Sequence, residues 1–326
     1  MTHPLIRTTA SILSPLRYPG GKRRLVGYVA EALRLNGQRP AVYVEPFAGG
    51  ASVALQLLND GLVERAVLGE RDPLVAAFWR VVFSDPERLI RDMERADVSV
   101  AAWERMRAYH PRSDRGKALK CFYLNRTSFS GILADTAGPI GGKAQASAYG
   151  IGCRFPKARL AQRIRQAAAL ADRVALVHEG DWAATLAVAQ ALATTPEELF
   201  VYLDPPFYRK ADRLYRHHFD AAAHERLADG VARLRDQGVP LLLSYDDADA
   251  IAALYEARGF APGRVELMYS AIGKAGPARA PELVVSTIPR LPGATRLWRT
   301  SGEWRASGDG AADGAPALAT RQDRHA

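Results

Sequence analysis

Short apolar runs alternate with amphipathic stretches along most of the chain. The apolar runs predict strands at Ala41–Glu45, Ala66–Gly69, Arg173–His178, Leu199–Asp204, Pro240–Tyr245, Val265–Ser270 and Leu283–Ile288. The stretches between several of them predict helices at Arg23–Leu35, Ser52–Asn59, Pro73–Phe83, Arg159–Ala171, Ala221–Asp236 and Ala248–Arg258. Strands that alternate with helices favour a mostly parallel sheet covered on both faces. The pattern therefore predicts one doubly wound α/β domain with a seven-stranded sheet.

The alternation breaks between residues 84 and 156. The pattern there is helical at first and then passes into a Gly-, Ser- and aromatic-rich segment, residues 125–152. We therefore predict a mainly helical inserted domain at 84–156, between two parts of the α/β domain at 1–83 and 157–300. Residues 301–326 contain few large apolar side chains, which predicts a disordered tail.

Composition excludes several classes of protein. The 326 residues are 48% apolar, but no apolar run approaches the ~18 residues that span a bilayer. The N-terminus has no continuous apolar stretch of a secretory signal, so we expect a soluble, cytoplasmic protein. Two cysteines, Cys121 and Cys153, are too few for a disulfide scaffold, and no His or Cys cluster has zinc-ligand spacing. We expect no metal site.

The positive charge is concentrated in one region. The whole chain carries a net charge of +9, yet residues 105–165 alone hold thirteen Lys and Arg against two acidic residues, a net of +11. The rest of the chain therefore carries −2. A basic excess confined to one region is expected of a polyanion contact, although a solvated arginine-rich face has the same composition.

A glycine turn follows the first predicted strand. The strand ends at Glu45, and Pro-Phe-Ala-Gly-Gly follows at 46–50. Such a turn lets backbone approach a ligand at the carboxyl end of a strand, where open α/β sheets bind ligands. The dinucleotide fingerprint G-x-G-x-x-G is absent, which disfavours an NAD or FAD enzyme. Glu70 closes the second strand and suits hydrogen bonds to ribose hydroxyls, whereas Asp72 suits a helix cap.

The strongest chemical signal is Asp204-Pro-Pro-Phe207, where a hydrophobic strand ends abruptly. The two prolines force an extended exit from the sheet. The Asp204 carboxylate and the Pro205 carbonyl then form two fixed acceptors beside the Phe207 ring. Two acceptors and a stacking surface are what an exocyclic amino group on a flipped base requires.

In their order, these motifs resemble the Dam-like, S-adenosylmethionine-dependent, N6-adenine-specific DNA methyltransferase family. The matching segments are Leu16-Arg-Tyr18-Pro-Gly-Gly-Lys22, Glu45–Gly50, Phe122–Gly131, Asp204–Phe207, Ser244-Tyr-Asp-Asp, Tyr269–Lys274 and Glu282–Ser286. The resemblance therefore covers about residues 16–289. It implies a Rossmann-like methyltransferase fold with the insert as a DNA-recognition domain. It also implies direct in-line methyl transfer to N6 of a flipped adenine in double-stranded DNA. Phe207 stands where Tyr is commoner, and Glu70 where Asp is usual.

The resemblance assigns roles residue by residue. It implies a catalytic site of Asp204, Pro205 and Phe207. It implies cofactor contacts at Tyr18, Lys22, Glu45, Phe47, Gly49, Gly50, Glu70, Asp181 and Asp204. The DNA-binding candidates are Asn125, Arg126, Ser128, Lys143, Arg154 and, in the same polar loop, Gln145; Asn125 equally suits a structural cap.

Several alternatives stay open at this point. Neither cysteine suits covalent catalysis on cytosine C5, but an N4-cytosine or RNA amino-methyltransferase, or a catalytically dead DNA-binding relative, would carry similar motifs. The expected partner is double-stranded DNA, and a cognate restriction endonuclease acting separately is compatible with the motifs. We expect a monomer, because one such chain can hold both sites.

Overall fold

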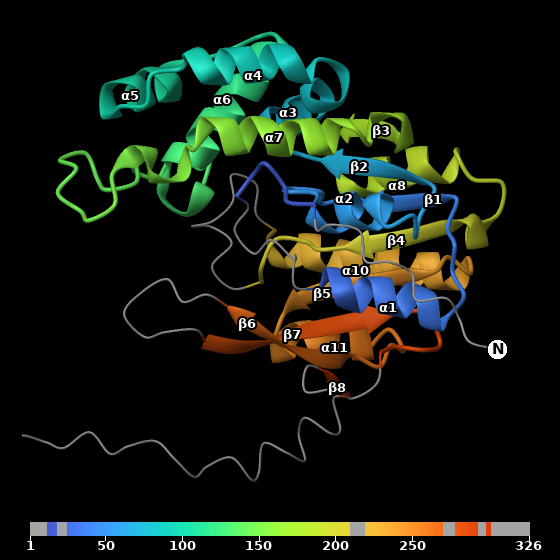
Figure 1. Cartoon of the computed structure of the whole chain (residues 1–326). Coiled ribbons are helices and arrows are strands. Elements are labelled where there is room, and N and C mark those ends of the chain that lie inside the picture. The colour runs from blue at the N-terminus through green and yellow to red at the C-terminus, as the bar shows by residue number, and fades with distance from the viewer. Residues whose placement is uncertain (1–11, 18–24, 209–218, 270–277, 293–297, 301–326) are drawn as a thin grey trace, which may run out of the picture.

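The computed structural model describes residues 12–17, 25–208, 219–269, 278–292 and 298–300. Within them, eight strands form one sheet in the order β3-β2-β1-β4-β5-β7-β6-β8 (Figure 1). The strands are β1 Val42–Glu45, β2 Arg65–Glu70, β3 Val174–Glu179, β4 Leu199–Leu203, β5 Leu241–Asp246, β6 Gly263–Tyr269, β7 Ala278–Ser286 and β8 Trp298–Thr300. The predicted mostly parallel α/β fold is confirmed, and all seven predicted strands are present.

Five neighbouring strands, β3, β2, β1, β4 and β5, run parallel, and β7 enters antiparallel beside β5. β7 begins five residues before its predicted start, because residues 278–282, which form no apolar run, also pair with β6. The eighth strand, β8, was not predicted, since its three residues show no alternation. The central strand β1 pairs with both β2 and β4. The chain order reverses there, and open α/β sheets bind ligands at such a point.

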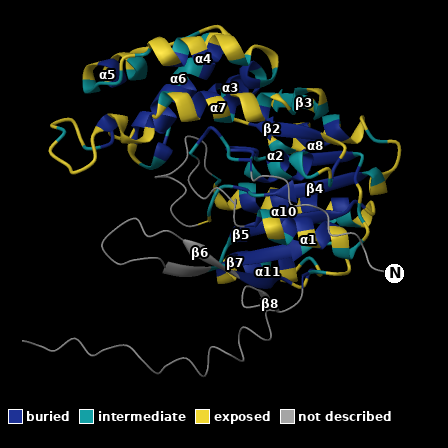
Figure 2. Ribbon diagram, in the orientation of Figure 1, coloured by how far each residue is buried: buried dark blue, intermediate teal, exposed yellow. Residues whose placement is uncertain are grey.

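Helices cover both faces of the sheet. Side chains alternate along β1: Tyr43 packs in the core with α1, α2 and α3, whereas Val42 and Val44 pack with α8, α10 and α11. The helices are α1 Val26–Leu35, α2 Ser52–Asn59, α3 Pro73–Ser84, α8 Trp182–Gln190, α10 Ala221–Asp236 and α11 Asp249–Glu256, with 3-10 turns η3 Ala171–Arg173 and η4 Pro196–Glu198. Figure 2 shows the inner strands buried between helices whose outer faces are exposed, whereas the edge strand β3 is only partly buried. Within the ranges given above, no helix is both long and apolar enough to cross a membrane.

The predicted helical insert packs on α3 and α7, above the β2–β3 side of the sheet (Figure 1). It comprises α4 Pro86–Arg95, α5 Val100–Ala108, α6 Asp114–Thr127, η1 Phe129–Gly131 and η2 Ile151–Arg154, before α7 Lys157–Ala168. The Phe122 ring on α6 stacks on Phe78 of α3 at 5.7 Å between centroids. Arg80 on α3 pairs with Asp114 on α6 and with Glu179 on β3. The division at 84–156 stays a prediction, and residues 301–326 lie outside the described residues.

The close packing of α10 on α8 predicts an unusual response to Gly230→Ala. Alanine is favoured over glycine in a helix by about 1 kcal/mol, but here the new methyl group would overlap the Trp182 ring, with Cζ3 at 2.6 Å. We expect Gly230→Ala to destabilise the protein by roughly 1–3 kcal/mol, the usual range for overpacking. Gly27→Ala on α1 is the matched control, because no atom lies within 4 Å of its added methyl group. A free energy of unfolding in urea that was higher for Gly230→Ala than for the wild type would contradict this packing.

Candidate active site

Acidic residues follow the carboxyl ends of four adjacent parallel strands. Glu45 ends β1, Glu70 ends β2, Asp181 lies two residues beyond β3, and Asp204 directly follows β4. Because β3, β2, β1 and β4 are neighbours, these four residues share one edge of the sheet. Sequence reasoning chose all four, and the fold brings them to the point where a ligand is expected.

The glycine turn after β1 is clamped by its neighbours. Gly49 has a φ of +45°, a conformation that favours glycine, and its N–H donates to Glu70 Oε2 at 3.0 Å. Its carbonyl accepts from Trp79 Nε1 at 2.8 Å, and Ala48 N–H donates to the Gly69 carbonyl at 2.9 Å. The turn is therefore tied to β2 and α3, and Glu70 has a structural task besides any contact with a ligand.

Two of the edge carboxyls are buried. Glu45 Oε2 accepts from Ala54 N–H at 3.0 Å and from the Tyr43 hydroxyl at 3.4 Å. Burial, with a smaller contribution from the nearby Asp204 charge, raises the pKa of Glu45 to about 8. Burial likewise raises the pKa of Glu70 to about 7. These carboxyls change charge near neutral pH instead of near pH 4.5.

The donor set at this edge fits a cationic nucleoside cofactor. Carboxyl oxygens accept hydrogen bonds from ribose hydroxyls, and in their ionised form carboxylates attract a positive ligand and repel a pyrophosphate. Gly50 is buried in the turn beside the half-buried Phe47, whose ring meets Phe219 at 5.8 Å. Asp181 is exposed and caps α8 through Ala184 N–H at 2.8 Å. Tyr18 and Lys22 lie outside the described residues.

The Asp-Pro-Pro-Phe segment leaves β4 beside β5. Ser244 Oγ on β5 donates to Asp204 Oδ1 at 3.1 Å, and Tyr208 N–H donates to Asp246 Oδ1 at 2.6 Å. Pro205 is buried and Phe207 is half-buried. Hydrogen bonds to β5 at residues 204 and 208 therefore fix both ends of the segment. They hold the Asp204 carboxylate and the Pro205 carbonyl in one geometry.

Three of the DNA-binding candidates are buried and hydrogen-bonded in this structure. The side chain of Asn125 donates to the carbonyls of Arg17 and Gly131 and accepts from Arg17 N–H. Arg126 donates through Nε to the Pro15 carbonyl at 2.8 Å, and Ser128 Oγ accepts from Trp103 Nε1 at 3.0 Å. These contacts give the three residues a scaffold role: Asn125 and Arg126 hold the N-terminal segment, and Ser128 joins the end of α6 to α5.

The remaining candidates lie on the loop after that turn. The Gln145 side chain bridges the two ends of the loop: it donates to the Ile140 carbonyl at 2.8 Å and accepts from Ile151 N–H. Lys143 is exposed and pairs with Glu104 at 3.0 Å, and Arg154 is exposed on η2. Lys143 and Arg154 therefore remain the accessible positive charges among the predicted DNA contacts.

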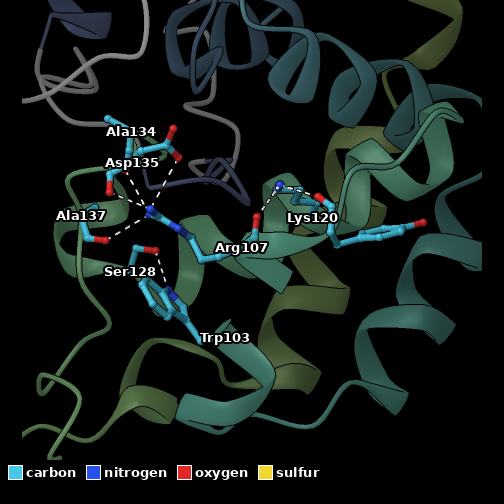
Figure 3. A network of polar contacts seen from close by, with 8 residues as sticks. Trp103, Arg107, Lys120, Ser128, Ala134, Asp135 and Ala137 are labelled. Carbon is cyan, nitrogen blue, oxygen red and sulfur yellow. Dashed lines mark hydrogen bonds and ion pairs between the residues drawn. The ribbon is translucent and has the colours of Figure 1, made fainter. Parts of the chain in front are cut away.

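Figure 3 shows how the base of this loop is held. The Arg107 guanidinium donates to the carbonyls of Ala134, Asp135 and Ala137 and lies over the Trp103 ring, 5.1 Å from its centroid. Lys120 donates to the carbonyl of Arg107 itself. Two of the thirteen basic residues counted in the sequence, Arg107 and Lys120, thus donate hydrogen bonds to backbone carbonyls. The count of basic residues therefore overstates the positive charge that is available to bind DNA.

Sequence reasoning missed two exposed aromatic side chains near the insert loop. Phe129 is 54% exposed on a turn where Ser130 and Gly131 have φ of +54° and +77°, and Tyr149 is 66% exposed. The available signal was an aromatic residue within a Gly- and Ser-rich segment that has no amphipathic pattern. Arg17 was also missed as a charge, and it lies close to Arg126 and Arg154.

The strand order, with β7 antiparallel beside five parallel strands, and the acidic edge define a Rossmann-like methyltransferase. The chain belongs to the D12 class N6 adenine-specific DNA methyltransferase family, which it matches over residues 18–270. It is accordingly an adenine-specific DNA methyltransferase.

The chain is also similar to individual proteins. A curated relative, the Type II methyltransferase M.MjaIII of Methanocaldococcus jannaschii, is 24% identical over 269 residues, which are 74% of this chain and 87% of that protein. A solved structure, precorrin-6y C5,15-methyltransferase from Geobacter metallireducens GS-15, aligns over 88% of this chain and 92% of that one. It has 12% identity and a TM-score of 0.35, so the fold is assigned from the strand order itself.

The buried carboxyls predict how stability depends on pH. Because Glu45 has a pKa of about 8 when folded and near 4.5 otherwise, its contribution to stability is full at low pH and is lost as pH rises through 8. We expect the free energy of unfolding to fall between about pH 5 and pH 8 by more in the wild type than in Glu45→Gln, at about 1.4 kcal/mol per unit of raised pKa. Urea titrations at both pH values measure this, with Glu31→Gln, at an exposed position of α1, as the control. An equal fall in wild type and Glu45→Gln would contradict the burial of this carboxyl.

Proposed function

We propose that Asp204, the Pro205 carbonyl and Phe207 carry the methyl transfer to adenine N6 in double-stranded DNA, with S-adenosylmethionine as the donor. One observation carries the proposal: the Asp204 carboxylate is fixed by β5 at the switch point between β1 and β4. In support, D12 family members are N6 adenine-specific DNA methyltransferases, and methyltransferases of this fold generally use S-adenosylmethionine.

Asp204 and Pro205 would make the amino group of adenine a better nucleophile. The lone pair of adenine N6 is delocalised into the ring, so the amino group attacks poorly. When the Asp204 carboxylate and the Pro205 carbonyl each accept a hydrogen bond from one N–H of the amino group, the nitrogen can become pyramidal. Its lone pair then points toward the methyl group that is transferred. Positive charge that develops on N6 is then stabilised by acceptors that are already in place. Phe207 stacks on the flipped base and holds it at reacting distance.

S-adenosylmethionine, when bound, supplies an electrophilic methyl group on a sulfonium. We assign its binding to the glycine turn and the acidic edge, with Phe47, Gly49 and Gly50 against it and Glu70 toward its ribose. Asp181 would reach its adenine, Glu45 and Asp204 border the site, and the expected contacts of Tyr18 and Lys22 complete the set.

The insert supplies the DNA contacts in this proposal. Burial, followed by the nearby charges of Arg163, Arg17 and Arg154, lowers the pKa of Arg126 to about 9. A phosphate placed among these guanidiniums would relieve their mutual repulsion. Phe129 and Tyr149 present exposed rings from the same region, and an apolar ring can fill the space that a flipped base vacates. Lys143 and Arg154 are the exposed phosphate contacts, and Asn125, Arg126 and Ser128 act through the scaffold.

We further propose that the enzyme acts as a monomer, since one chain contains both the acceptor pair and the basic insert. We also propose a separate cognate restriction endonuclease as a partner, and the similarity to M.MjaIII, a Type II methyltransferase, supports this. Cytosine N4 and RNA are the substrates against which adenine in DNA has to be tested.

Removal of the catalytic carboxylate should lower turnover strongly. We expect Asp204→Ala to lower kcat by roughly 100-fold or more, because a preorganised group that stabilises developing charge is lost. Transfer of labelled methyl groups to unmethylated DNA measures turnover. Calorimetry with S-adenosylmethionine serves as the control, and we expect cofactor affinity to weaken far less than turnover. Unchanged turnover in Asp204→Ala would overturn the proposed mechanism.

The phosphate contacts predict a salt signature. We expect Arg154→Ala to weaken DNA binding and to reduce the slope of log affinity against log salt by about 1, the value for one phosphate contact. Arg233→Ala removes the same charge in the last turn of α10, remote from the carboxyl edge of the sheet, and should leave the slope unchanged. Fluorescence anisotropy with labelled duplex DNA measures both. Equal slopes for Arg154→Ala and the wild type would remove Arg154 from the interface.

A further inference from the structure

A chain of two buried hydroxyl groups lies behind the Asp204 carboxylate. Ser244 Oγ is 3.1 Å from Asp204 Oδ1, and the Tyr202 hydroxyl is 2.9 Å from Ser244 Oγ. Tyr202 and Ser244 are fully buried. Tyr202 precedes Asp204 by two residues, and Ser244 lies on β5 one residue beyond the Leu203–Leu243 pair, so the register of β4 and β5 creates the chain.

The direction of both hydrogen bonds follows from counting protons. An ionised carboxylate can only accept, so the single hydroxyl proton of Ser244 is donated to Asp204. Ser244 then has no proton for Tyr202, and Tyr202 must be the donor to Ser244 Oγ. Burial raises the pKa of Tyr202 well above its usual value, so the phenol keeps that proton. Both hydrogen bonds therefore point toward Asp204.

We propose that Ser244 is a positioning residue for methyl transfer, with Tyr202 orienting the Ser244 hydroxyl. A donor held on Oδ1 fixes the plane of the carboxylate and thereby the direction in which its second oxygen faces the adenine amino group. Because the donor is itself held by Tyr202, the carboxylate needs no reorientation as charge develops on N6. This inference rests on the proposed function of Asp204, but it assigns roles to two residues that never touch the substrate.

The test separates a positioning role from a folding defect by comparing the change in kcat with the changes in cofactor affinity and in KM for DNA. We expect Ser244→Ala to lower kcat by roughly 10- to 100-fold, the effect of losing one hydrogen bond to a charged group, with little change in cofactor affinity or in KM for DNA. Ser286→Ala is the matched control: Ser286 lies on β7, its hydroxyl donates to the Leu241 carbonyl at 2.8 Å, and the variant should keep the wild-type kcat. Ser244→Cys keeps the volume and a weak donor, so its kcat should lie between those of Ser244→Ala and the wild type.

Tyr202→Phe tests the second hydrogen bond. Its kcat should fall less than that of Ser244→Ala, and adding it to Ser244→Ala should lower kcat no further, since the chain is already broken. Wild-type kcat in Ser244→Ala, or an equal loss in Ser286→Ala, overturns the positioning role, and additive losses in the double variant overturn the role of Tyr202. If Ser244→Ala does not fold, Ser244→Cys decides, and a wild-type kcat there overturns the proposal. An active Asp204→Ala would instead overturn the proposed function itself.

Discussion

The hydrogen bonds between the buried Glu70 carboxyl and the turn after β1 are the interaction on which the site depends. Gly49 can follow β1 in a left-handed conformation because Glu70 accepts its N–H and Trp79 donates to its carbonyl. The same carboxyl accepts from Asp72 N–H, where Asp72 caps α3. One acidic residue therefore joins two strand ends and a helix start. Burial raises the pKa of this carboxyl to about 7, and its two oxygens still accept the backbone N–H groups that hold the turn where the cofactor is proposed to bind.

In the insert, polar side chains hydrogen-bond to the backbone of loops, and other side chains of those loops remain exposed to solvent. Asn125 joins the segment at 12–17 to the turn at 129–131, and Arg107 holds the loop at 134–137. With the backbone so fastened, Phe129 and Arg154 are exposed on the short 3-10 helices η1 and η2. A loop that must meet DNA in one geometry benefits from this arrangement, because less conformational entropy is lost on binding.

Much of the fold could be predicted from the sequence, since the information is local. The α2 and α10 helices begin and end where the amphipathic pattern predicts, and each strand of the parallel sheet matches an apolar run. The α8 helix was missed because Trp182–Gln190 is apolar without a polar face. The motifs also identified the carboxyl edge, because parallel strands deliver consecutive strand ends to the same place.

The contacts that could not be predicted connect distant parts of the chain. Asn125 bonds to Arg17 across 108 positions, so the sequence around it shows only a polar residue in a basic region. For the same reason Arg126 is a DNA contact by composition but a buried scaffold residue by structure. Ser244 and Asp204 are 40 positions apart, and only the β4–β5 register reveals that one donates to the other.

The central claim is that the acceptor pair at the end of β4 serves the amino group of adenine in DNA. The most direct measurement is to incubate the purified chain with S-adenosylmethionine and unmethylated DNA, digest the DNA to nucleosides, and identify the modified base by mass spectrometry. The account predicts N6-methyladenine in the wild type and its loss in Asp204→Ala. N4-methylcytosine, or no methylated base from a protein shown to bind S-adenosylmethionine, would contradict it.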